Sequence, residues 1–311
     1  MEKRNAAVFI LLGQSNAVGH GIPMKESDKI TKPLSRVFGL SRALNQTLHP
    51  QKLTFSGYLS AGMNLAETQD DTYSLANCLA KRWESAAEMN PALPDLYIIQ
   101  IAIGAQGVGP GYMWNPDYPE TMVPGRLGVV NISLFPYTER ILSLLEPTFE
   151  ELGISYDILA LHWRGGENDT VTDMPRVMIP LLKPIYRQLF AMFERALGTM
   201  PPTVLYESKF GLRNLNRTDG VNLANMCATT MALNEMFRAF AEEIPEISTF
   251  DPFSLPLYDP EEPLTWGIFS PTDGVHYSGS ANDEIAGQIM RQAEEKYCGS
   301  FFGSYPHSAI T

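Results

Sequence analysis

The chain alternates short apolar runs with longer stretches of helical periodicity. The first run, AAVFILL, is apolar throughout, as expected for a strand buried on both faces of a sheet. Two later runs, LYIIQIAI and YDILALHW, have the same character and are followed by glycines. The pattern predicts strands at Ala7–Leu12, Lys52–Ser56, Leu96–Ile103, Tyr156–Trp163 and Thr203–Glu207, with a short edge strand at Glu246–Phe250.

Amphipathic helical patterns occupy the gaps between these runs. They predict helices at Tyr73–Met89, Tyr137–Leu152, Arg176–Leu197, Val221–Glu242 and Ser280–Tyr297. Strands that alternate with helices of this length are typical of right-handed βαβ units and a parallel sheet. The predicted fold class is therefore α/β, a three-layer α/β/α sandwich with a flavodoxin-like parallel sheet.

We expect one domain over residues 1–311, with long loops at Gln106–Pro136, Ser208–Gly220 and Asp251–Thr272. Loops of this length in a compact domain are often functional. The first holds Tyr112, Trp114 and Tyr118, whose rings would either stack on a sugar or fix the loop to the surface.

Composition narrows the classes of partner. The formal net charge of −12 argues against nucleic acid and anionic membranes as partners. No stretch approaches the roughly 18 apolar residues of a membrane span, and the seven-residue run near the start fits a buried strand better than a signal peptide. The default expectation is a cytoplasmic protein, and a homo-oligomer is compatible with the sequence.

The three cysteines, Cys78, Cys227 and Cys298, are odd in number and far apart, which favours buried free thiols over disulfides or a zinc site. No histidine or cysteine stands at ligand spacing among the acidic groups. We expect no metal and no cofactor.

Candidate site residues follow the predicted strands, where a parallel sheet gathers its ligands. Ser15 comes after the first strand, Gly104 after the third, and Asn168 after the fourth. Near the C-terminus, Asp273 precedes His276 by three residues, so that one turn can direct both side chains to one place.

Each of these signals has a structural alternative: a helix-capping serine, a loop glycine, turn chemistry at Asn168 and a surface histidine. Together they predict a nucleophile, oxyanion donors, a base and its orienting carboxylate.

The same residues resemble a known family. GQSN after the first strand, a later glycine, Gly-x-Asn-Asp and a late DxxH resemble the SGNH hydrolase superfamily. FILLGQSNAVGHG and HWRGGEND resemble its carbohydrate-esterase branch, which includes acetylxylan esterases and sialate O-acetylesterase-like proteins. In one departure, Gly165 stands where that branch usually has a glutamine.

The resemblance implies metal-free hydrolysis of O-acetyl or similar short esters. It implies Ser15 as nucleophile and first oxyanion donor, Gly104 and Asn168 as further donors, and Asp273 with His276 as the rest of the triad.

Other polar residues near the motifs are candidates for substrate contact. Arg164 and Glu167 flank the fourth-strand motif and would contact substrate or support the loop. His20 follows Ser15 by five residues and is a candidate to line the pocket, but it has no carboxylate near it in sequence. His162 is expected to be structural. The substrate-binding candidates are Gln14, Arg164, Glu167 and Trp114.

The predicted activity is that of a serine esterase that acts on short-chain, acetyl esters through an acyl-enzyme. Its partner would be a small-molecule or oligosaccharide ester, with O-acetyl groups on a carbohydrate preferred. Two alternatives stay open: a lipase- or thioesterase-like SGNH hydrolase acting on acyl chains, and a non-catalytic carbohydrate-binding protein.

Overall fold

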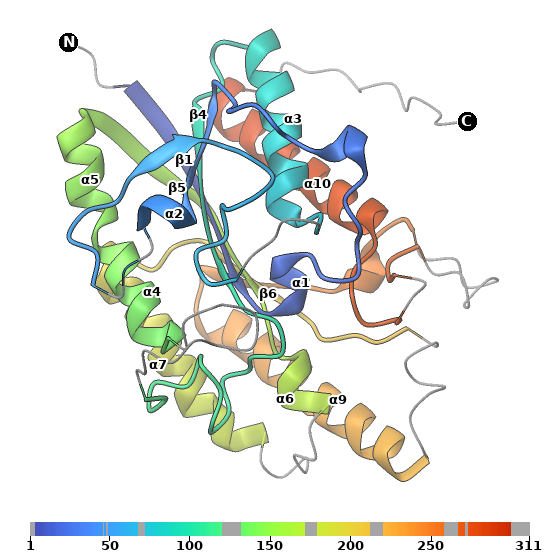
Figure 1. The fold of residues 1–311 in the computed structure, drawn as a ribbon. Coiled ribbons are helices and arrows are strands. Elements are labelled where there is room, and N and C mark those ends of the chain that lie inside the picture. Colours follow the sequence, from blue (N-terminus) through green and yellow to red (C-terminus); the bar gives the residue numbers. More distant parts are fainter. Residues whose placement is uncertain are drawn as a thin grey trace.

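A single seven-stranded sheet forms the middle layer of the molecule (Figure 1). The computed structural model describes residues 4–45, 47, 49–67, 72–119, 132–171, 179–211, 220–257, 267–270 and 273–299. The strand order is β3-β2-β4-β1-β5-β6-β7, and every neighbouring pair is parallel except β2 with β3. The strands are β1 (Arg4–Gly13), β2 (Val37–Leu40), β3 (Phe55–Gly57), β4 (Asp95–Ala102), β5 (Ile154–Arg164), β6 (Thr203–Tyr206) and β7 (Ile247–Phe250).

The central strand β1 separates two hydrophobic cores. Val8, Ile10 and Leu12 pack into one core, and the intervening Phe9 and Leu11 pack into the other. Successive side chains of a strand point to opposite faces, so a strand covered on both sides must be apolar throughout. The uninterrupted run in the sequence is explained by this position.

Helices cover both faces, which gives the predicted three-layer sandwich. Helices α3 (Leu75–Met89) and α10 (Gly279–Cys298) pack side by side on one face (Figure 1). The other face carries α4 (Leu134–Ser143), α5 (Leu145–Leu152), α7 (Ile179–Leu197) and α9 (Gly220–Glu243). Three short helices, α1 (Ser15–Val18), α2 (Arg42–Asn45) and α6 (Glu167–Val171), complete the α-helices of the described ranges.

The structure differs from the predicted elements in several places. The predicted strand Lys52–Ser56 is observed at Phe55–Gly57 and runs antiparallel to β2. The sheet gains β2, which the sequence pattern did not reveal because it is four residues long and contains Gly39. The predicted helix Tyr137–Leu152 is two helices that meet at Leu144. Pro147 favours the break, because its ring would clash with the carbonyl four residues earlier, at Ser143.

The three predicted long loops are described only in part. The first is described over 106–119 and 132–136, the second over 208–211 and at Gly220, and the third over 251–257 and 267–270. Their remaining residues lie outside the described ranges. Helices α4 and α9 begin inside the ends of the first two loops, at Leu134 and Gly220.

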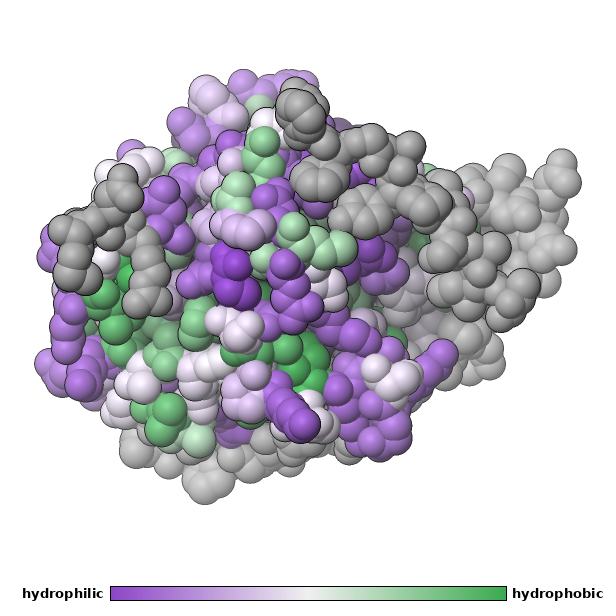
Figure 2. Space-filling view, turned by 90° about the horizontal axis from the view of Figure 1, so that it is seen from above, coloured by the Kyte–Doolittle hydropathy of each residue, from purple (hydrophilic) through white to green (hydrophobic). Residues whose placement is uncertain are grey.

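The surface is mixed in character at the end of the sheet where the strands begin. Figure 2 shows this end with hydrophilic and hydrophobic residues interspersed. No helix in the described parts of the chain is long and apolar enough to cross a membrane. The three cysteines are free, but the expectation that all are buried is wrong: only Cys78 is buried, and Cys227 on α9 is exposed.

Candidate active site

The carboxyl ends of the three central strands lie at one level. Gly13, the last residue of β1, is paired with Ala102 of β4 on one side and Arg164 of β5 on the other. Ser15 and Gly104 each follow this row by two residues. The sheet register therefore brings together segments that are far apart in sequence, such as Gly13 and Arg164.

Gly13 makes the turn that presents Ser15. Its φ is +138°, and a Cβ at this position would stand 2.1 Å from the carbonyl oxygen of Arg164. The next residue, Gln14, donates its backbone N–H to that same carbonyl at 2.9 Å. Only glycine fits so close an approach of two strands. Ser15, which is half-buried, then begins α1 just beyond the carboxyl end of β1.

The structure brings Asp273 and His276 into direct contact. The Nδ1 atom of His276 lies 2.7 Å from Oδ2 of Asp273, while Oδ1 accepts the backbone N–H groups of Val275 and His276 at 2.8 and 3.0 Å. Burial acts to raise the pKa of Asp273, but these hydrogen bonds outweigh it and lower the pKa below its ordinary value. The carboxylate therefore stays ionised and fixes the ring so that Nε2 is the nitrogen that can take a proton.

Asn16 connects the His276 segment to the Ser15 turn. Its Oδ1 accepts the backbone N–H of Tyr277 at 2.9 Å, and its Nδ2 donates to the carbonyl of Val275 at 3.3 Å. The residue next to Ser15 thus holds the residues on both sides of His276. This role could not be read from the sequence pattern, although Asn16 is part of the GQSN motif.

Glu167 and Gln14 are buried against this same asparagine. The Glu167 carboxylate accepts the side-chain amides of Gln14 at 2.5 Å and of Asn16 at 2.9 Å. Glu167 is 5 % exposed and Gln14 is 2 % exposed. Their contact with substrate stays a prediction, and in this structure the Gln14 Nε2 donates to the Glu167 carboxylate inside the protein.

Arg164 and Trp114 are also buried. Arg164 is fully enclosed, donates to Asn282 Oδ1 at 2.7 Å and to the Asn16 carbonyl at 3.2 Å, and contacts the rings of both Tyr206 and Tyr277. Trp114 is fully buried too, and its indole N–H donates to the Gly13 carbonyl at 3.0 Å. Both side chains hold the segment at the end of β1, and their contact with substrate stays a prediction.

Gly165, the departure from the carbohydrate-esterase pattern, has a packing reason. A Cβ there would lie 3.1 Å from the indole ring of Trp163, which is itself buried. That closeness leaves little space for the side chain that the branch usually carries at this position.

Gly104 has an unexpected partner. Its backbone N–H donates to Oε2 of Glu67 at 2.6 Å, and Oε1 of the same carboxylate lies 3.0 Å from Nε2 of His20. Glu67 is 2 % exposed. The predicted second oxyanion donor is therefore already engaged by a carboxylate. Glu67 gave no signal in the sequence, since it is 47 residues from His20 and belongs to no motif.

Asn168 and Asp169 follow β5 on helix α6. Asn168 is half-buried, whereas Asp169 is fully buried. Asp169 accepts the backbone N–H groups of Val108 at 3.2 Å and Gly109 at 3.0 Å. Burial raises its pKa to about 6 despite these bonds. Asp169 thus fixes the loop after β4 beside the helix that carries Asn168.

No protein-family model matches the chain, and no curated protein sequence matches it significantly. Solved structures do. NanS aligns with a TM-score of 0.58 and 15 % identity over 95 % of this chain and 99 % of its own. A protein from Arabidopsis thaliana aligns with a TM-score of 0.56 and 14 % identity over 94 % of this chain and 99 % of its own. The chain has the fold of the SGNH hydrolases.

A carbohydrate acetylesterase from Xanthomonas citri is similar as well. It aligns with a TM-score of 0.51 and 11 % identity over 95 % of this chain. The aligned region spans 57 % of the length of that acetylesterase. At sequence identities of 11 to 15 %, the similarity to these structures shows a shared fold and nothing more. The predicted fold class and the resemblance to this superfamily are confirmed at that level.

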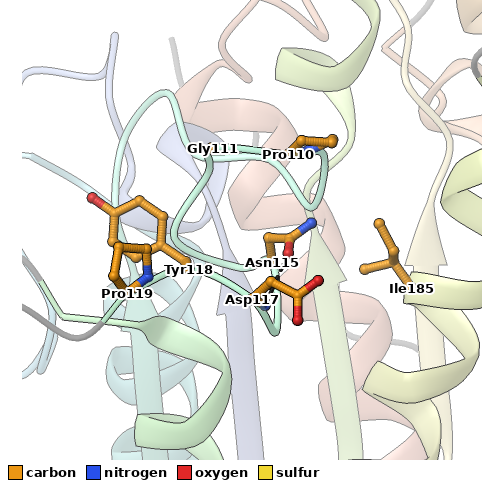
Figure 3. Close-up of a pocket in the computed structure, with 7 residues that line it drawn as sticks. All are labelled: Pro110, Gly111, Asn115, Asp117, Tyr118, Pro119 and Ile185. Atoms are coloured by element: carbon orange, nitrogen blue, oxygen red, sulfur yellow. Dashed lines mark hydrogen bonds between the residues drawn. The ribbon is translucent and has the colours of Figure 1, made fainter.

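A separate cavity lies beside the loop that follows β4. It has a volume of about 460 Å³. Figure 3 shows Asn115, Asp117 and Tyr118 of this loop along one side of it and Ile185 of α7 opposite. None of the predicted catalytic residues lines it. Among the described residues, no group of three or more His, Cys, Asp or Glu side chains could hold a metal ion.

Proposed function

We propose that this protein is a serine esterase, with Ser15 as nucleophile, His276 as general base and Asp273 as the carboxylate that orients it. Nε2 of His276 takes the Ser15 proton as Oγ attacks the ester carbonyl. The imidazolium then gives that proton to the departing alcohol, and water hydrolyses the acyl-enzyme by the same steps.

One observation carries the proposal: the 2.7 Å contact between His276 and Asp273 lies in the segment that Asn16 holds beside Ser15. An Asp–His pair alone is common on protein surfaces. A pair held by the residue adjacent to a serine at the end of a central strand has the parts that acyl transfer requires.

For the oxyanion, we assign the Ser15 N–H and the Asn168 amide as donors. The N–H of the first helical residue has no partner within its own helix, and Asn168 is partly accessible. Gly104 is not assigned this role while Glu67 accepts its N–H at 2.6 Å.

For the substrate, we propose a short acyl group, acetyl above all, on a carbohydrate or another small polyhydroxylated alcohol. The similarity of fold to a carbohydrate acetylesterase supports this choice. The net charge of −12 supports a neutral ester over a polyanionic partner. We also propose that the protein resides in the cytoplasm.

The test is hydrolysis of p-nitrophenyl acetate by the wild type and by Ser15→Ala. We expect the variant to lose activity by at least about 10³-fold, because the nucleophile is removed while the fold is retained. Ser27→Ala, which changes an exposed serine of a surface turn, is the matched control and should retain full activity.

Labelling with a serine-directed fluorophosphonate gives an independent reading. Covalent labelling of the wild type but not of Ser15→Ala would agree with the proposal. An active Ser15→Ala variant would refute the assignment of the nucleophile. A preference for long over short acyl chains in a series of p-nitrophenyl esters would refute the proposed substrate class.

A further inference from the structure

A second carboxylate–imidazole pair lies next to the first. Nε2 of His20 is 3.0 Å from Oε1 of Glu67, and the His20 and His276 rings are 5.9 Å apart between centroids. The two pairs are bonded through different ring nitrogens: His276 uses Nδ1, whereas His20 uses Nε2.

The Glu67 contact determines what His20 can offer to a ligand. An ionised carboxylate only accepts hydrogen bonds, so Nε2 of His20 carries the hydrogen. In the neutral ring Nδ1 is then an acceptor. The backbone N–H of Gly104 holds the other oxygen of Glu67, which fixes the carboxylate and, through it, the ring.

His20 is placed beside the reacting serine. Its backbone N–H donates to the carbonyl of Ser15 at 3.0 Å. A Cβ on Gly104 would stand 2.5 Å from Cε1 and 3.0 Å from Nδ1 of His20, so the edge of the ring that carries Nδ1 borders the loop after β4. The His20 side chain is 30 % exposed while that of Glu67 is 2 % exposed. The imidazole therefore reaches solvent and its anchor does not.

We propose that His20 determines specificity for the alcohol half of the ester: its Nδ1 accepts a hydrogen bond from a hydroxyl next to the esterified oxygen. A polyhydroxylated alcohol such as a sugar offers that hydroxyl, and a simple alkyl alcohol does not. Glu67 is a positioning residue that holds the tautomer. This inference rests on the proposed esterase function, and it identifies the neighbouring hydroxyl as the substrate group that the same site recognises.

The test pairs two substrates with two proteins. The substrates are a mono-O-acetylated methyl xyloside and the analogue in which the hydroxyl next to the ester is replaced by hydrogen. For the wild type, kcat/KM should favour the hydroxylated substrate by about tenfold or more. In His20→Phe, which keeps a ring of similar size but lacks Nδ1, that ratio should fall close to one.

Two further variants separate positioning from a general loss of structure. His20→Asn keeps an acceptor near the place of Nδ1 and should restore part of the preference. His49→Phe makes the same change at an exposed histidine outside the site and should leave the ratio as in the wild type.

The outcomes distinguish the two proposals. An active wild type with no preference for the hydroxyl, or a preference that survives in His20→Phe, would overturn the inference and leave the esterase assignment intact. Failure of the wild type to hydrolyse either substrate, together with p-nitrophenyl acetate, would remove the esterase assignment and this inference with it.

Discussion

Three histidines of the chain differ in how exposed their side chains are and in which group each one contacts. His276 and His20 are partly exposed, and each contacts a carboxylate. His162 is buried in β5, with Nδ1 2.8 Å from the hydroxyl of Tyr206. Burial, with a further contribution from the charge of Arg164, lowers the pKa of His162 to about 3. The expectation that His162 is structural is confirmed.

The lowered pKa of His162 predicts a dependence of stability on pH. In the unfolded chain this histidine takes up a proton near its ordinary pKa of about 6.5, whereas in the folded protein it stays neutral down to about pH 3. The unfolded state therefore binds more protons in this window, and stability falls as the pH falls. Between pH 7 and 5 we expect His162 to contribute a loss of about 2 kcal/mol in the free energy of unfolding.

Urea denaturation of the wild type and of His162→Gln at both pH values measures this loss. The variant has no titrating group at this position, so its own loss should be smaller by about 2 kcal/mol. Taking the difference cancels the contributions of other groups, among them Asp169, whose raised pKa acts with the opposite sign. Equal losses in the two proteins would contradict the lowered pKa.

At the scale of elements, the site depends on how β1 ends. The strand passes into α1 through Gly13, whose backbone approaches Arg164 of β5 so closely that a side chain has no place. The same strand pairing aligns the residues that precede Ser15 and Gly104. The position of the serine is thus a property of the junction between strands and not of α1 by itself.

Gly13→Ala should disrupt this junction. Its Cβ would lie 2.1 Å from a backbone oxygen, and the φ of +138° is unfavourable for alanine. We expect a loss of at least about 3 kcal/mol in the free energy of unfolding, with loss of the proposed esterase activity. Gly220→Ala is the matched control, since a Cβ there meets nothing within 4 Å among the described residues, and its effect should be within about 1 kcal/mol. Thermal denaturation of both variants would show whether the effect is specific to the junction.

At the scale of the whole molecule, Arg164 joins several of the elements around the site. It extends from β5, bonds the Asn16 carbonyl of α1 and Asn282 of α10, and contacts the rings of Tyr206 and Tyr277. Tyr277 follows His276 directly. The arginine therefore links the end of the sheet, the serine turn and the histidine segment.

Arg164→Met tests this link. Methionine fills similar volume but leaves the Asn16 carbonyl and Asn282 without their donor and removes both cation–ring contacts. We expect a loss of about 2–4 kcal/mol in the free energy of unfolding, measured by urea denaturation. The control is Arg82→Met, which removes an exposed ion pair of α3 with Asp283 of α10. That change should cost less than about 1 kcal/mol, and a similar loss in both variants would contradict the role of Arg164.

The sequence by itself determined the features that depend on local pattern. Apolar runs predicted the central strands because both faces of those strands are covered, and helical periodicity predicted the main helices within a few residues. It also predicted the contact of Asp273 with His276, since three residues of chain are enough to bring both side chains together. The break near Pro147 is also a local effect, but Pro184 lies inside α7 without ending it, so proline alone did not determine where the helices break.

Only the tertiary structure decided which polar residues face solvent and what they bind. Gln14, Arg164, Glu167 and Trp114 have the chemistry of substrate-binding residues, but the packing of layers against β5 buries them. Glu67 contacts His20 and Gly104, which are both far from it in sequence. It accepts the backbone N–H of Gly104, which the family resemblance predicts as an oxyanion donor. Burial and long-range pairing depend on where distant segments come to lie, and that information is absent from any short stretch of sequence.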